Sequence, residues 1–189
     1  MKFVPQHDMM DCGPACLSMI ANHYGKDYSV QYLRETTYIT REGVSLLGIT
    51  QAATDIGFST LPTKLTLAKL KELSLAKQVP FPCVLHWNQT HFVLLCKVSK
   101  NPFTGKFQFK LADPGHGFIT LSEDKFIKGW LSEDDEGVAL FLEPTEHFYS
   151  RNPEKVHRFS IAYLFAYLVP FRKKLSLMFL LLILGSALN

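Results

Sequence analysis

The spacing of apolar residues changes near residue 80. Before that point, apolar residues recur at helical spacing, which predicts helices over 12–24, 44–56 and 66–78 and a shorter helix within 28–40. Gly25, Gly57 and Pro80 follow the three longer stretches, where they are typical of helix ends. The first part of the chain is therefore expected to be mainly helical.

After residue 80, short apolar stretches separated by turn residues predict strands instead. We expect strands over 81–87, 91–98, 106–111, 118–121 and 138–142, and a short helix around 124–130. The residues 88–90 and 101–105 are rich in Asn, Pro and Gly and predict hairpin turns. Helices followed by an antiparallel sheet indicate an α+β domain, which we place at residues 1–145.

The C-terminal part has a different character. Residues 144–157 are polar, and we expect a loop there. We assign residues 146–171 to a linker that includes an amphipathic or interfacial helix at 158–169. An uncharged apolar run over 175–188 follows, shorter than the roughly 20 residues that a full membrane span needs. We predict that residues 172–189 are the start of a first transmembrane helix. The alternative is a helix buried in the domain.

Charge and cysteine content narrow the possible classes of protein. Residues 1–150 contain 14 Lys and Arg against 16 Asp and Glu, whereas residues 151–189 contain 6 against 1. A basic tail that is also strongly apolar favours contact with a membrane and argues against nucleic acid. The N-terminus has no apolar signal segment, so we expect a cytosolic domain with four free thiols. The spacing of Cys12 and Cys16 does not fit a zinc site, and we expect no metal.

Candidate chemistry is concentrated in the stretch "QHDMMDCGPACLSMI", which begins at Gln6. Cys12 stands at the predicted start of a helix, where free N–H groups and the helix dipole favour a thiolate nucleophile. Cys16 lies one turn deeper and is expected to be buried and inert. The alternative is that both cysteines only fill the core, as buried cysteines commonly do.

A cysteine nucleophile needs further groups, and the sequence contains candidates at the ends of predicted elements. His91 opens the strand "HFVLLCKV" and could serve as the acid and base. Asp113 ends the next strand and could orient the imidazole if the two strands pair. Gln6 could donate to an oxyanion together with the backbone N–H of Cys12. Each residue alone has a structural alternative, since a histidine at a strand end is often packed and Asp-Pro-Gly is common turn chemistry.

The order of these residues resembles the peptidase domain of bacteriocin-processing ABC exporters, the family of double-glycine leader peptidases. The resemblance rests on "QHDMMDCGPACL" from Gln6, "WNQTHFV" around His91 and "ADP" around Asp113, and it covers about residues 1–145. It implies a papain-like fold with Cys12 as nucleophile, His91 as acid and base, Asp113 as orienting acid and Gln6 as oxyanion donor. Trp87, beside His91, is a candidate for the wall of the substrate cleft.

The resemblance also implies an activity and partners. The expected reaction is cleavage of a precursor peptide after a Gly-Gly pair in its leader, without a cofactor in the peptidase domain. In the complete exporter, expected to be a homodimer, an ATP-binding domain would use ATP and Mg to export the product. The peptidase domain would lie at the cytoplasmic face of the bacterial membrane. Two alternatives remain: a domain that only docks leaders, and another papain-like acyl transfer.

Overall fold

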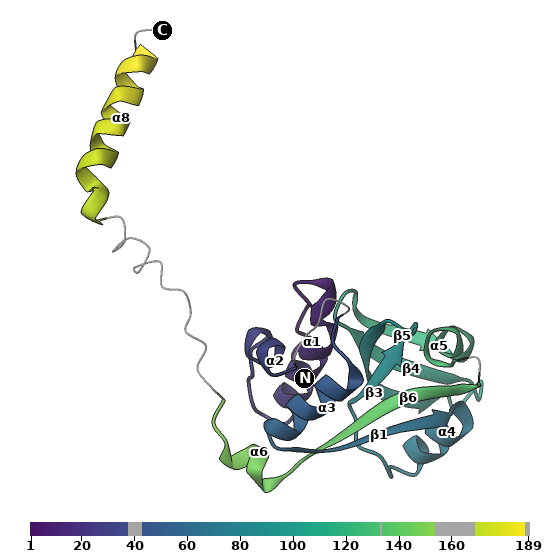
Figure 1. Cartoon of the computed structure of the whole chain (residues 1–189). Helices are drawn as coiled ribbons and strands as arrows, with labels where there is room; N and C mark the ends of the chain where they lie inside the picture. The colour runs from purple at the N-terminus through teal and green to yellow at the C-terminus, as the bar shows by residue number, and fades with distance from the viewer. Residues whose placement is uncertain (38–42, 133, 154–168, 188–189) are drawn as a thin grey trace. The chain divides into compact units, whose positions relative to one another are not determined.

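The computed structural model describes residues 1–37, 43–132, 134–153 and 169–187 (Figure 1). Contacts divide the chain into two compact units, Met1–Glu154 and Lys155–Asn189. The first unit contains η1 (Met9–Asp11), α1 (Cys12–His23), α2 (Val30–Thr36), α3 (Leu46–Asp55), β1 (Phe58–Thr66), α4 (Leu67–Leu75), β2 (Cys83–Trp87), β3 (His91–Lys100), β4 (Phe107–Asp113), β5 (Gly117–Ser122), α5 (Glu123–Trp130), β6 (Glu136–Pro144) and α6 (Glu146–Ser150). The second contains η2 (Val169–Phe171) and α8 (Arg172–Ala187).

The centre of the first unit is one antiparallel sheet with the strand order β1-β6-β2-β3-β4-β5. Residues that alternate along β3 pack on opposite faces: Leu94 contacts the cluster that includes α1 and α3, whereas Val93 and Leu95 contact the cluster that includes α4 and α5. Helices therefore cover both faces of the sheet (Figure 1). The predicted α+β class is confirmed.

The predicted elements are present with small shifts at their ends. The helix expected over 66–78 begins one residue later, because the Thr66 hydroxyl accepts from the backbone N–H of Lys69 and so caps α4. The five strands expected after residue 80 are all present, and the hairpin that joins β2 to β3 pairs Trp87 with His91.

One strand lies where the sequence analysis expected none. β1 pairs with β6 along nine residues, from Phe58 opposite Pro144 to Thr66 opposite Glu136. Pro62 lies in the middle of β1 and cannot donate a hydrogen bond to a sheet. The proline is tolerated because β1 is an edge strand and β6 is its neighbour on one side only.

The prediction of a loop over residues 144–157 is wrong for its first part. α6 forms there, and the Phe148 side chain is fully buried in the cluster on the α1 face. Lys26 donates from Nζ to the carbonyl oxygens of Tyr149 and Arg151, at 2.8 and 2.6 Å. These contacts join the segment to the helical layer, and the compact unit continues past residue 145 to Glu154.

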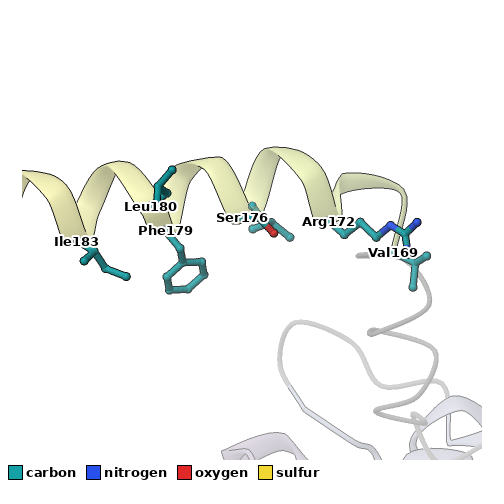
Figure 2. A pocket seen from close by; sticks show the side chains of 7 residues that line it. Val169, Arg172, Ser176, Phe179, Leu180 and Ile183 are labelled. Carbon is teal, nitrogen blue, oxygen red and sulfur yellow. The ribbon is translucent and has the colours of Figure 1, made fainter.

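The second unit is described only from residue 169 onward, so the helix expected over 158–169 lies almost wholly outside the described residues. Several apolar side chains of α8, among them Phe179, Leu180 and Ile183, are more than half exposed. Figure 2 shows these three on the helix surface. Within the described part of the chain, no helix reaches the length and apolar content needed to cross a membrane.

Candidate active site

Cys12 is the first residue of α1, as the sequence predicts. The preceding turn η1 is closed by a capping box, in which Asp8 accepts from the Met10 backbone N–H and Asp11 accepts from the Asp8 N–H. The Cys12 side chain is nearly buried, with 4% of the residue exposed. Its sulfur therefore lies at the positive end of a helix and is almost wholly covered by protein.

Gly13, the next residue, permits this placement. A Cβ atom at Gly13 would lie 2.5 Å from Val44 Cγ1 and 2.8 Å from Ile49 Cδ1, so a side chain there would push α1 away from α3. The absence of a side chain lets the start of α1 lie directly against residues of and before α3. The sequence analysis noted Gly13 only as a residue that suits a first helical turn.

An ion pair beside Cys12 was not predicted. Asp11 is 2% exposed, and its Oδ1 accepts from Arg34 Nε at 2.7 Å. A buried carboxylate next to a cysteine would otherwise oppose the formation of a thiolate by charge repulsion. Arg34 neutralises that charge and also contacts Asp8 at 3.4 Å, so it holds the turn that presents Cys12. The position of Asp11 before Cys12 is evident from the sequence, but its ion pair with Arg34 on α2 could not be predicted from the sequence.

His91 opens β3, directly after the turn that joins it to β2. Asn88 and Gln89 adopt positive φ values of 48° and 60°, which reverse the chain within the turn. His91 Nε2 lies 2.9 Å from Asp113 Oδ1. The Cys12 side chain lies close enough to the imidazole to raise the pKa of His91. Because Nε2 faces Asp113, Nδ1 is the ring nitrogen available to the sulfur.

Asp113 ends β4, and its position follows from strand pairing. β3 and β4 are antiparallel neighbours with Leu94 opposite Ala112, so the start of β3 and the end of β4 lie at the same end of the sheet. The carboxylate accepts three hydrogen bonds. Oδ1 accepts from His91 and from the Gly115 backbone N–H, and Oδ2 contacts His116 Nδ1, each at 2.9 Å.

The electrostatics of this group favour a protonated His91 beside the Asp113 carboxylate. Burial would lower the pKa of His91, but the hydrogen bond to Asp113 and the nearby Cys12 outweigh it and raise that pKa to about 9. Burial likewise opposes the charged form of Asp113, yet its hydrogen bonds, first of all from His91, lower the pKa of its carboxyl to about 2. His91 therefore keeps its proton at neutral pH.

Cys16 behaves as predicted for a core residue. It is fully buried, and its thiol donates to the backbone oxygen of Phe92 at 3.5 Å. Burial, reinforced by the nearby Cys12 and Asp113, raises the pKa of the Cys16 thiol well above its usual range. The structure thus distinguishes the two cysteines by their surroundings, and all four cysteines are free.

Gln6 lies beside the turn that carries Asp113. Its backbone N–H donates to the Pro114 oxygen at 3.1 Å, and its Nε2 would be 3.6 Å from a Cβ placed on Gly115. Its Oε1 atom is buried and has no hydrogen-bond partner among the described residues. Gln6 therefore lies beside the turn that follows Asp113, and its action on an oxyanion stays a prediction.

Trp87 packs against α5. Its ring is half-buried, lies 5.7 Å from the Phe126 ring and fills the space where a side chain at Gly129 would stand. These contacts hold the ring on α5. Its proposed contact with substrate stays a prediction.

A groove adjoins the β2–β3 hairpin that carries His91. It has a volume of about 320 Å³ and lies between the start of α3 and the β2–β3 hairpin. Its lining includes Val44, which contacts the space above Gly13, and Phe92, which follows His91. Among the described residues, no group of three His, Cys, Asp or Glu side chains is placed to hold a metal ion.

Comparisons with known proteins agree with this geometry. Residues 1–147 match the Peptidase C39 family. The colicin V secretion/processing ATP-binding protein CvaB of Escherichia coli is 31% identical over 186 residues, which is 98% of this chain and 24% of CvaB. The transport/processing ATP-binding protein ComA of Streptococcus pneumoniae (strain ATCC BAA-255 / R6) is 31% identical over 153 residues, which is 80% of this chain and 20% of ComA.

Solved structures show the same fold. The peptidase domain of Streptococcus ComA, a bi-functional ABC transporter, matches with a TM-score of 0.64 at 31% identity, over 76% of this chain and 98% of that domain. A double glycine motif protease from an AMS/PCAT transporter, solved in complex with the leader peptide, matches with a TM-score of 0.63 at 25% identity, over 76% and 91%. The chain spans about a quarter of the curated relatives' length at most.

Proposed function

Because this chain belongs to the Peptidase C39 family, we propose that its first unit is a cysteine peptidase that cleaves leader peptides after a Gly-Gly pair. One observation carries the proposal: Asp113 hydrogen-bonds to His91, and Cys12 at the start of α1 lies close enough to the imidazole to raise the pKa of His91. A thiol, an imidazole and a carboxylate in that order are what nucleophilic attack on an amide requires. The protease solved with its leader peptide supports the substrate class.

In the proposed reaction, the Cys12 thiolate attacks the carbonyl carbon of the second glycine. The Gln6 amide and the Cys12 backbone N–H stabilise the oxyanion. His91 then gives its Nδ1 proton to the nitrogen of the leaving amine, and the C–N bond breaks to leave a thioester on Cys12. A water molecule gives a proton to His91 and its oxygen attacks the thioester. The C–S bond breaks, the leader leaves as a carboxylic acid that loses its proton to solvent, and the thiolate–imidazolium pair is restored.

The near-complete burial of Cys12 supports a preference for glycine. Only 4% of the cysteine is exposed, so the substrate backbone must approach the protein surface closely to reach the sulfur. Glycine is the residue whose backbone can do this without a side-chain clash. We place the adjoining part of the leader in the groove between α3 and the β2–β3 hairpin, which opens beside the same residues.

We extend the proposal to the complete protein as an exporter that processes and transports its peptide. The curated relatives are named as secretion, transport and processing ATP-binding proteins. Arg172, Lys173 and Lys174 precede the exposed apolar side chains of α8, and basic residues before an apolar helix are typical of a cytoplasmic flank. In this view the exporter is a homodimer that uses ATP and Mg elsewhere, with the peptidase at the cytoplasmic face of the membrane.

Mass spectrometry of a synthetic precursor with a Gly-Gly leader tests the peptidase. We expect a single cut after the second glycine in the wild-type protein, and no cut with Cys12→Ala. Cys96→Ala is the matched control, since it removes a half-buried thiol that does not contact His91 or Asp113 in the structure. Iodoacetamide should label Cys12 before the buried Cys16.

Three results would contradict the proposal. Cleavage that survives Cys12→Ala would remove the nucleophile. Binding of the leader without any cut by the wild-type protein would support the alternative of a docking domain. A product in which the leader is joined to an added amine would support acyl transfer in place of hydrolysis.

A further inference from the structure

Asp113 uses both oxygens of its carboxylate, and the second oxygen contacts a histidine that the proposed reaction does not employ. Oδ1 accepts from His91 Nε2 and from the Gly115 backbone N–H. Oδ2 lies 2.9 Å from His116 Nδ1. Rotation of the carboxylate would break contacts on both sides, so His116 opposes any rotation that would take Oδ1 away from His91.

The turn between β4 and β5 places His116 in this position. Asp113 pairs with Gly117 across the two strands, and the His116 backbone N–H donates to the backbone carbonyl oxygen of Asp113 at 3.1 Å. Gly117 adopts a φ of 94°, which a residue with a side chain rarely adopts. The turn therefore directs the imidazole back onto the side chain three residues earlier.

Core packing does not explain the contact. The His116 side chain is 78% exposed, whereas the Asp113 side chain is 8% exposed. An exposed imidazole contributes little apolar burial, so the bond to the carboxylate is its main interaction in the structure. The bond therefore connects a solvent-exposed side chain to the buried carboxylate of Asp113.

A carboxylate only accepts, so Nδ1 of His116 carries the hydrogen of this bond. The other groups around Asp113 are the Gln6 amide and, on α1, the thiols of Cys12 and Cys16.

We propose that His116 is a positioning residue of the peptidase: it anchors the second oxygen of Asp113 so that the first stays on His91. The inference rests on the proposed function for its effect on cleavage. It also predicts an effect that needs no substrate, because the imidazole held by Asp113 sets the reactivity of the Cys12 sulfur.

Two substitutions at His116 separate positioning from bulk structure. His116→Ala removes the bond to Oδ2. His116→Asn retains a donor, since the Asn amide nitrogen lies about as far from the backbone as Nδ1, but it cannot take up a proton. His147→Ala is the matched control: it removes another exposed histidine, on α6, whose side chain is not in contact with the triad.

The assays are the cleavage rate with the Gly-Gly precursor and the rate of iodoacetamide alkylation of Cys12, each across the acid and neutral range, together with a thermal melt. We expect His116→Ala to lower kcat roughly fivefold, the size of one ordinary hydrogen bond, with little change in KM. It should slow alkylation similarly. His116→Asn should restore both rates, because it keeps the donor to Oδ2. The melting temperature should not change enough to explain the loss.

Failure of the inference is distinct from failure of the proposed function. If the wild type cuts no Gly-Gly precursor, the peptidase is refuted, while alkylation still measures the effect of His116. If His116→Ala matches His147→Ala in both assays, His116 has no positioning role. If His116→Asn is as slow as His116→Ala, the donor to Oδ2 is not what matters, and the inference is overturned.

Discussion

Replacing Phe148 with alanine tests whether α6 is part of the peptidase core. The Phe148 ring is fully buried and lies 4.4 Å from the Phe58 ring and 6.4 Å from the Tyr28 ring. It therefore joins the end of the compact unit both to β1 and to the helical layer. If this packing is intrinsic to the fold, Phe148→Ala should leave a cavity between the sheet and the helices.

The expected loss can be estimated from burial. Removal of a fully buried phenylalanine side chain typically lowers the free energy of unfolding by about 3–5 kcal/mol. A domain of this size has about 5–15 kcal/mol in total. The melting temperature should fall by roughly 6–20 °C, at about 2–4 °C for each kcal/mol. Part of the population could then be unfolded under conditions in which the wild type is folded.

Urea unfolding followed by tryptophan fluorescence measures the effect, because Trp130 is buried and Trp87 half-buried in the core on the other face of the sheet. Phe103→Ala is the matched control. It removes the same side chain from a residue that is 96% exposed in the turn between β3 and β4, and it should change stability by no more than about 0.5 kcal/mol. A loss below about 1 kcal/mol for Phe148→Ala would refute the assignment of α6 to the core.

Three further predictions concern the catalytic group. Gln6→Ala should lower kcat by about 10²–10³-fold with little change in KM, as loss of an oxyanion donor does, and activity within about twofold of wild type would leave Gln6 without that role. Asp113→Asn should impair cleavage less than His91→Ala, since the amide oxygen still accepts from Nε2; equal loss in single-turnover assays would argue against an orienting role. Cleavage should decline as the pH rises through about 9, where His91 loses its proton. Because this pKa is raised from 6.5, the stability that the proton contributes is complete below about pH 6.5 and lost through about pH 9, which urea melts across that range would check.

The three residues of the proposed triad were accessible from the sequence because each is marked by local signals. Cys12 begins an apolar helical pattern, His91 follows a turn and opens a strand, and Asp113 stands before Pro-Gly. Whether a segment forms a helix or a strand depends on the spacing of its apolar residues, which can be read from the sequence alone. Gln6 was identified through the order of all four residues and not through a signal of its own.

Tertiary structure decided what depends on distant partners. Pro62 argues against a strand, and only the position of β1 at the edge of the sheet accommodates it. Phe148 stands in a polar segment, so its burial could not be predicted before its neighbours on other elements were placed. The pairing of Arg34 with Asp11 and of His116 with Asp113 likewise depends on how separate elements and a turn meet. Sequence periodicity indicates which elements form, whereas the hydrogen bonds that orient a catalytic group arise only when those elements pack together.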